Sequence, residues 1–307
     1  MNYIHNMIDD LDLQQLRMFF VLARTRSFTR TGQQLFRTQS AVSHAIRKLE
    51  QTIGATLFHR TRRALFLTDE GECLFSACER LFGAIESAVE EIAARKGTSV
   101  GKLRVGATVE FGCTILMRHM RAFMESHPEI EMSFELHHEL ISRLMEDRLD
   151  IIIDCKEHAL PSLKKTPLFR EKYVVVCSKE YFSEYKPTTL DQLENCTILS
   201  MDQALTWWNN FCLTIPEDRR PTFRRLVPIN HVRGIITAAR EGIGVAFVPR
   251  YCVLNEIQNG ELKVLFPDLE LLEDRFVLYQ KESRSGLLRN RLFTRYLLQI
   301  HPSEFGA

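Results

Sequence analysis

The sequence predicts a small, mainly helical N-terminal domain, one long helix, and a larger C-terminal α/β domain. Three observations support this prediction. Helix caps recur at short intervals before residue 54, and an apolar stripe then continues for about three heptads over 74–92. From residue 101 onward, short apolar strands alternate with amphipathic helices. A chain of 307 residues is long enough for two or three domains.

Three short helices are expected first. Leu13, Leu16, Phe19, Phe20 and Ala23 have helical spacing, and this helix should end near "RTRS". Ser27 can cap a second helix that contains Phe28, Thr31 and Leu35, and Thr38 can cap a third that Gly54 ends. The apolar face of the third helix consists of Val42, Ile46, Leu49 and Ile53.

The opposite face of the third helix carries short hydrogen-bonding side chains and a cation: Ser40, Ser43, His44, Arg47 and Gln51. Gln, Ser and Arg can read base edges or bond to phosphates, and a helix fits the major groove of DNA. The N-terminus near Thr38 also favours an anion. A plain solvated face would carry more Glu than Glu50 alone.

This N-terminal region carries a large excess of positive charge. From Leu13 to Thr68 the chain has ten Lys and Arg and one acid, which gives +9 and leaves −8 for the rest. "ATLFHRTRRALFLT" (55–68) is expected to form a two-stranded wing with arginines at its turn. The pattern therefore predicts a winged helix-turn-helix on double-stranded DNA. The expected DNA contacts are Thr38, Gln39, Ser40, Ser43, His44, Arg47, Arg60, Arg62 and Arg63.

A long helix is expected from Asp69 to the flexible segment 95–101. Its apolar face is too broad for an isolated helix, which predicts dimerisation. The a/d positions are Leu74, Cys78, Leu81, Ile85, Ala88 and Ile92. The expected limits are 11–69 for the DNA-binding domain, 70–96 for the linker helix and 101–307 for the C-terminal domain.

In the C-terminal domain the predicted strands are "KLRVGA", "IEMSFEL", "DIIID", "KYVVVCS", "CTILS", "GVAFVP" and "DRFVLYQ". The predicted helices are "TILMRHMRAFMESHP", "ELISRLMEDRL", "VRGIITAARE" and "LLRNRLFTRYLLQI". Strands interleaved with helices indicate parallel sheets.

The chain also resembles the LysR-type transcriptional regulators. The resemblance is dense over "LQQLRMFFVLARTRSFTRTGQQLFRTQSAVSHAIRKLEQTIGATLFHRTRRALFLTDEG" (13–71) and weaker at "LRVGA", "LDIIID" and "GIGVAFVP". Thr31-Gly32 departs from the two alanines usual in the family. Glycine preserves the small size but costs helix propensity, about 1 kcal/mol relative to Ala.

The resemblance implies a homodimer, commonly paired into a tetramer, that binds palindromic promoter DNA and responds to a small-molecule effector. RNA polymerase is an open further partner. It also implies a C-terminal domain of the periplasmic-binding-protein type. Lobe I would be about 101–168 and 273–300, and lobe II about 172–267, with crossings near 168–173 and 265–275.

Ligands in such folds lie between the lobes, at strand C-termini and helix N-termini. The expected effector-binding residues are Thr108, Glu110, Phe111, His138, Asp154, Met201 and His231. Glu110, Asp154 and Asp202 would disfavour an anion, which predicts a neutral or cationic effector. The alternative is that Glu110 faces solvent and His138 only caps a helix.

Other functions fit the sequence less well. A metal-responsive site could use His137, His138, Asp154, Cys155 and His158, and a redox response could use Cys196 and Cys212. The remaining alternatives are a solute-binding protein and an enzyme, but no Gly-x-Ser-x-Gly, P-loop, dinucleotide or His-Glu-x-x-His motif occurs. No cofactor, bound metal, signal peptide or membrane segment is expected, and eight scattered cysteines favour the cytoplasm.

Overall fold

The computed structural model describes residues 10–60, 64–98, 100–269, 271, 273–301 and 304. The chain divides into two compact units between Ile92 and Ala93. Within the described ranges, no helix is long and apolar enough to cross a membrane.

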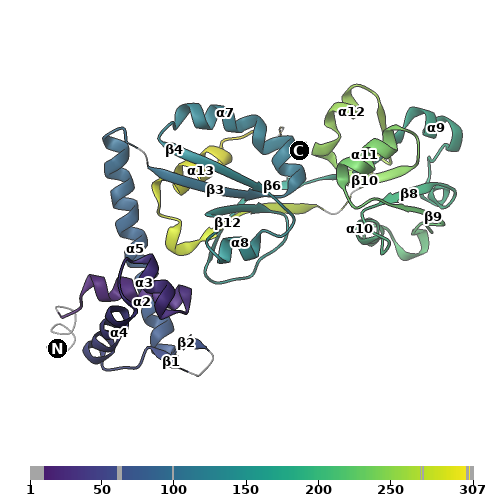
Figure 1. Cartoon of the computed structure of the whole chain (residues 1–307). Helices are drawn as coiled ribbons and strands as arrows, with labels where there is room; N and C mark the ends of the chain where they lie inside the picture. The colour runs from purple at the N-terminus through teal and green to yellow at the C-terminus, as the bar shows by residue number, and fades with distance from the viewer. Residues whose placement is uncertain are drawn as a thin grey trace. The chain divides into compact units, whose positions relative to one another are not determined.

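The N-terminal unit is a trihelical head with a hairpin and a long helix (Figure 1). Its elements are α2 (Leu13–Thr25), α3 (Phe28–Gln34), α4 (Gln39–Ile53), β1 (Phe58–Arg60), β2 (Leu65–Leu67) and α5 (Asp69–Arg95). The predicted caps are confirmed, since the Arg30 and Ala41 amides donate to the hydroxyls of Ser27 (3.3 Å) and Thr38 (3.1 Å). Gly54 ends α4 with φ +72°, a conformation that favours glycine.

The core of the head lies between the helices and the hairpin. Val42, Ile46 and Leu49 are fully buried, as the spacing predicts, and pack in one cluster with Phe19 and Leu57. The apolar face of α4 therefore holds the helix against the head and leaves the polar face outside.

Thr31 and Gly32 are both buried where α3 approaches α4. The Thr31 hydroxyl lies 2.7 Å from the Thr25 hydroxyl and donates to the Ser27 carbonyl (2.8 Å). A Cβ on Gly32 would lie 2.6 Å from the Arg37 carbonyl oxygen. In this chain glycine therefore allows a close approach of α3 to the Arg37 carbonyl, in addition to its effect on helix propensity.

The C-terminal unit contains two five-stranded sheets (Figure 1). The first sheet has the order β4 (Ile130–Leu136), β3 (Gly101–Ala107), β5 (Ile151–Asp154), β12 (Asp274–Lys281) and β6 (Leu163–Glu171). The second has the order β11 (Leu262–Leu265), β7 (Tyr173–Ser178), β10 (Val245–Pro249), β8 (Thr197–Ser200) and β9 (Arg225–Pro228). We call the first sheet with its helices lobe I, and the second sheet with its helices lobe II.

The helices of this unit flank the sheets. They are α6 (Val109–Phe111), η1 (Gly112–Leu116), α7 (Met117–Ser126), α8 (Ile141–Met145), α9 (Lys179–Tyr185), η2 (Leu190–Asn195), α10 (Thr206–Leu213), η3 (Glu217–Arg219), α11 (Val232–Arg240), η4 (Arg250–Cys252), α12 (Leu254–Gln258), η5 (Glu282–Arg284) and α13 (Leu288–Leu298). Ile151 and Ile153 pack in the cluster that contains residues of α7 and α13, whereas Ile152 packs in the cluster that contains residues of α8. Strand alternation thus gives lobe I a helical layer on each face.

The prediction of parallel sheets is only partly correct. β3 pairs in parallel with β4 and β5, but β12 runs antiparallel to β5 and β6. In lobe II, β7 is antiparallel to both β10 and β11. The antiparallel strands β7 and β12 are the first strands that the chain forms after each crossing between the lobes. The first crossing runs from β6 through Lys172 into β7, and the second runs from β11 back to β12.

Candidate functional site

The exposed face of α4 is the candidate DNA interface. Of its predicted residues, Thr38, Gln39, Ser40, His44 and Arg47 are exposed and Ser43 is half-buried. Arg47 lies over one turn of the helix, with its Nε 3.4 Å from the Ser43 carbonyl oxygen. The structure therefore brings the predicted helical contacts together on one open face.

The first turn of α4 adds donors to that face. The Thr38 hydroxyl accepts the Ala41 amide, and the Val42 amide donates to the Thr38 carbonyl (3.1 Å). The amides of Gln39 and Ser40 have no partner among the described residues. Unpaired amides at the N-terminus of a 15-residue helix suit a phosphate oxygen.

The predicted wing is present as β1 and β2, which pair antiparallel from Phe58 opposite Leu67 to Arg60 opposite Leu65. Arg60 is the last residue of β1. Arg62 and Arg63 lie outside the described residues, so their roles stay predictions from the sequence.

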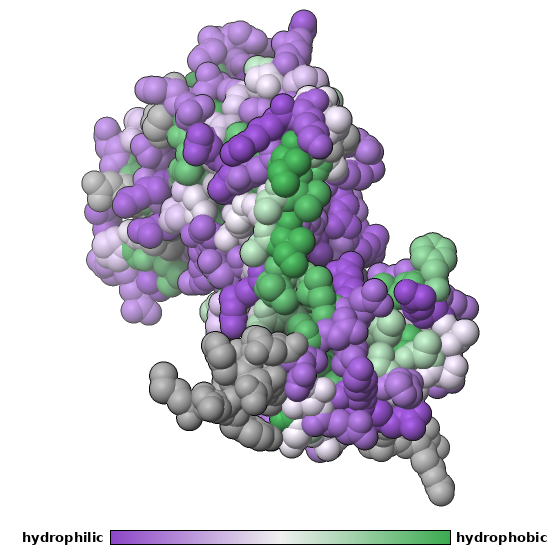
Figure 2. Space-filling model, turned by 90° about the vertical axis from the view of Figure 1, so that its left-hand side faces the viewer, coloured by the Kyte–Doolittle hydropathy of each residue, from purple (hydrophilic) through white to green (hydrophobic). Residues whose placement is uncertain are grey.

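The apolar stripe on α5 is divided between two environments. Leu81, Ile85, Val89 and Ile92 are 40–59% exposed, and Ala88 is exposed between them. Figure 2 shows the apolar side chains gathered along this helix. Within the part of the chain that the structure describes, these side chains have no apolar cover.

Two predicted members of the stripe are not available for a partner. Leu74 is half-buried and Cys78 is 2% exposed, and both pack in the core of the head. Burial raises the pKa of the Cys78 thiol to about 11. The first three turns of α5 thus complete the head, and the available stripe begins at Leu81.

Glu110 and His231 face each other across the two lobes. Glu110 follows β3, while His231 precedes α11, and the distance from Glu110 Oε1 to His231 Nδ1 is 3.8 Å. His231 Nδ1 already accepts the Arg233 amide (3.2 Å), so this nitrogen cannot also donate to the carboxylate. Burial raises the pKa of Glu110, and the positive charges of His231, His138 and Arg233 oppose that rise.

Two polar atoms near Glu110 are buried without a hydrogen bond in the described structure. They are Glu110 Oε1 itself and the hydroxyl oxygen of Thr108, two residues earlier. A buried carboxylate oxygen without a donor is costly, and a ligand donor would remove that cost. This end of β3 is therefore the best-supported ligand contact in the cleft.

The other predicted cleft carboxylates already have partners. Asp154 is 1% exposed, accepts the Lys156 amide (3.1 Å), and has its Oδ2 2.9 Å from His158 Nε2. Asp202 accepts the Thr206 amide (3.1 Å), and hydrogen bonds to Thr206 lower its pKa. The prediction that these two acids line the site for a ligand is thus unsupported by their contacts.

The remaining predicted pocket residues differ in their surroundings. Phe111 is 1% exposed and stacks on Phe276, with ring centroids 5.1 Å apart, so it is a core residue and not a ligand contact. Met201 is half-buried against the core cluster that contains Phe111. His138 is exposed, and its carbonyl accepts Lys156 Nζ (3.1 Å).

The residues of the metal alternative are not gathered into a ligand cluster, and the redox alternative stays a prediction. Across the described residues, no three His, Cys, Asp or Glu side chains converge as metal ligands. His137 Nδ1 accepts the Glu139 amide (2.8 Å). Cys196 is buried and Cys212 half-buried, both are free thiols, and burial raises the pKa of each.

Comparison with known proteins decides the family. The family model described as "Bacterial regulatory helix-turn-helix protein, lysR family" matches residues 13–72, and "LysR substrate binding domain" matches residues 96–300. The chain belongs to the LysR family of transcriptional regulators. Its function is therefore that of a DNA-binding transcription regulator with an effector-binding domain.

This LysR-family chain has relatives of similar length. It is 28% identical over 304 residues to the glycine cleavage system transcriptional activator of Escherichia coli K12, covering 95% of this chain and 94% of the relative. It shares its fold with CrgA of Neisseria meningitidis (23% identity, TM-score 0.60, 97% and 100% covered). ArgP of Mycobacterium tuberculosis is also similar (17% identity, TM-score 0.65, 94% and 97% covered).

Several charged groups of this LysR-family regulator were missed from the sequence. Glu171 is buried between the lobes, and burial raises its pKa to about 8. Arg233 lies near enough to Glu110 to act on its charge and pairs with Glu256 (2.9 Å). No local pattern identifies these residues, because their partners are far away in the sequence.

Proposed function

We propose that this regulator binds promoter DNA through the exposed face of α4 and changes its DNA binding when a neutral or cationic effector enters the cleft at Glu110. The observation that carries the DNA assignment is the separation of the two faces of α4. On its apolar face Val42, Ile46 and Leu49 are fully buried, while Gln39, Ser40, His44 and Arg47 stay exposed on a segment of charge +9.

Within the DNA interface we assign two kinds of contact. Gln39, Ser43, His44 and Arg47 would contact base edges in the major groove, since their side chains donate and accept hydrogen bonds. The amides of Gln39 and Ser40 and the wing arginines Arg60, Arg62 and Arg63 would contact phosphates. The first set supplies sequence discrimination and the second supplies affinity that depends on salt.

The test is filter binding of the full chain to the duplex upstream of its own gene and to a scrambled duplex. We expect specific binding whose log affinity falls with log salt by about 0.9 for each phosphate contacted. Equal affinity for both duplexes at cellular ionic strength would contradict the assignment.

We further propose that two copies pair through Leu81, Ile85, Ala88, Val89 and Ile92 of α5. A symmetric pair would present two α4 helices to the two halves of a palindrome. The exposure of these side chains supports the proposal, since apolar rows of this length on a helix are normally covered. Pairing of dimers into tetramers would follow as a further step.

The effector assignment depends on Glu110 and Thr108. Both offer buried polar atoms without partners, whereas Asp154 and Asp202 are already bonded. A ligand with an ammonium, amidinium or amide group would donate to Glu110 from between the lobes. His231 would meet the same ligand from lobe II.

The effector test is a thermal-shift screen of small nitrogenous and carboxylic metabolites. We expect stabilisation by basic or neutral nitrogen compounds. Strong stabilisation by simple dicarboxylates, with none by basic compounds, would overturn the assignment. Action in the cytoplasm without enzymatic activity, and contact with RNA polymerase at the promoter, complete the proposed function.

A further inference from the structure

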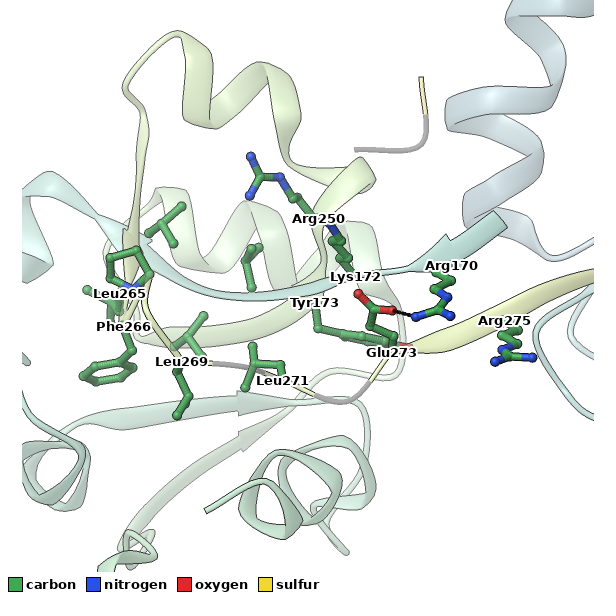
Figure 3. A pocket seen from close by; sticks show the side chains of 14 residues that line it. Arg170, Lys172, Tyr173, Arg250, Leu265, Phe266, Leu269, Leu271, Glu273 and Arg275 are labelled. Carbon is green, nitrogen blue, oxygen red and sulfur yellow. Dashed lines mark hydrogen bonds and ion pairs between the residues drawn. The ribbon is translucent and has the colours of Figure 1, made fainter. Parts of the chain in front are cut away.

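A cavity lies in lobe II beside the connections between the lobes and has a volume of about 610 Å³. Its wall combines the start of β7, the end of β11, the two strand ends that leave and enter lobe I, and five residues between β11 and β12: Phe266, Pro267, Leu269, Leu271 and Glu273 (Figure 3). The volume lies within the range of pockets that hold small molecules. None of the residues assigned to the Glu110 cleft lines it.

One end of this cavity is cationic. Four cations and one acid contribute to its lining: Arg170, Lys172, Arg250, Arg275 and Glu273. Arg170 Nη1 pairs with Glu273 Oε2 at 3.2 Å, which Figure 3 marks. Among the described residues, Lys172, Arg250 and Arg275 have no carboxylate partner. An excess of positive charge therefore faces the opening.

The other end is apolar. Figure 3 shows Leu265, Phe266, Leu269 and Leu271 on the side away from Arg170 and Arg275. Phe266, Leu269 and Leu271 are partly buried against the core cluster of lobe II that contains Trp208 and Phe247, so this wall is continuous with that core. Tyr173 lies between the apolar and cationic ends.

We propose that this cavity is a second ligand site, which takes a small amphipathic anion with a carboxylate or phosphate head and an aliphatic or aromatic body. The head pairs with Arg250 and Lys172, and the body lies against Leu269 and Leu271. The charge preference is opposite to that of the Glu110 cleft. The regulator would thus combine two chemically different signals.

Tyr173 connects this site to the connections between the lobes. Its hydroxyl lies 2.9 Å from Glu171 Oε2, at the end of β6, and 3.0 Å from Asp274 Oδ2, at the start of β12. Its ring packs edge-on against Trp207, with centroids 5.7 Å apart. A ligand against Tyr173 therefore touches a side chain that is bonded to both strands joining the lobes.

The test is calorimetric titration of the full chain with decanoate, below its micelle concentration, and with phenyl phosphate. Decyltrimethylammonium is the charge control, because it has the same chain with a cationic head. We expect at least one of the two anions to bind saturably at one site per chain and the cation not to bind there. Tryptophan fluorescence should change with the same midpoint, since Trp207 contacts Tyr173.

Matched variants locate the site. Lys172→Gln with Arg250→Gln should weaken anion binding at least about tenfold, the effect of losing charged hydrogen bonds. Leu269→Asp should do the same by opposing both the apolar body and the head. Arg121→Gln, which changes an exposed cation of α7, should bind the anion like the wild type.

Three outcomes would overturn the proposal: no saturable binding of either anion, equal binding of the cationic amphiphile, or unchanged binding in the Lys172/Arg250 variant. That variant changes only exposed side chains, so its fold should survive. Failure of the DNA or cleft assignments would leave this test unaffected, because its readout uses neither DNA nor a basic effector.

Discussion

Glu171 and Asp274 stand opposite each other on β6 and β12, and both carboxyl groups lie within hydrogen-bond distance of the Tyr173 hydroxyl. One hydroxyl has one proton and cannot donate to two carboxylates at once. Burial raises the pKa of Glu171 to about 8, so near neutral pH this carboxyl keeps its proton, while the Tyr173 hydroxyl donates to only one of the two carboxyl groups at a time. The two strands that join the lobes, β6 and β12, therefore meet at a carboxyl group whose protonation changes with pH.

The first prediction concerns pH and stability. Folded Glu171 keeps its proton to about pH 8, whereas the unfolded chain loses it near the ordinary value of 4.5. The folded state binds the extra proton, so this group lowers stability as pH rises between those values, by about 1.4 kcal/mol per pH unit.

Glu171→Gln mimics the protonated form and should remove that dependence. We expect the urea midpoints of wild type and variant to be similar near pH 5 and to diverge towards pH 8.5, with the variant more stable. If the urea midpoints of wild type and variant changed by the same amount across this pH range, the pKa of Glu171 would not differ between the folded and unfolded states.

The second prediction concerns Glu110. Glu110→Gln removes the charge of a half-buried carboxylate whose Oε1 has no hydrogen bond among the described residues, so the ligand-free protein should melt at a slightly higher temperature. The apparent affinity for basic ligands, measured by thermal shift, should fall at least about tenfold. Asp202→Asn is the matched control, since this carboxylate bonds to Thr206 and should leave ligand affinity unchanged.

The third prediction concerns pairing through α5. Ile85→Glu with Val89→Glu places two charges on the exposed stripe and should yield monomers in sedimentation experiments. Ser76→Glu, at an exposed position on the other side of the same helix, should leave the assembly intact. A monomeric wild type, or a paired double variant, would remove the role proposed for the stripe.

The fourth prediction separates the two DNA contacts. Arg47→Ala should reduce discrimination between the specific and scrambled duplexes, by about 1–3 kcal/mol if it contacts a base. Arg62→Ala should weaken binding to both duplexes about equally, and it should reduce the slope of log affinity against log salt by about 1. Filter binding at several salt concentrations distinguishes these effects, and specific binding that survives both changes would contradict the assignment.

The fifth prediction concerns Gly32. By helix propensity alone, Gly32→Ala should stabilise α3 by about 1 kcal/mol. The added Cβ would meet the Arg37 carbonyl oxygen at 2.6 Å, and a backbone atom cannot move aside cheaply. We therefore expect a lower melting temperature of the head in calorimetry. Gly286→Ala, which has open space around its Cβ, should be neutral.

The local features of the head were predictable because their interactions span few residues. Thr38 caps Ala41, three positions away, and the burial of Val42 and Ile46 follows from helical spacing. The strand β6 was missed, because "LKKTPLFRE" mixes charges and proline at a sheet edge. Among the described strands its partner is β12, about a hundred residues later, and no local pattern reveals such a partner.

The sequence by itself determined the family, the helix caps, the polar face of α4 and the apolar row of α5, because each depends on residue type and short-range spacing. Only the tertiary structure decided which polar groups are free. It bonded Asp154 to His158, left Glu110 Oε1 without a donor among the described residues and buried Cys78 in the head. Those outcomes depend on contacts between distant segments, and a carboxylate is available to a ligand only when no such segment has already bonded it.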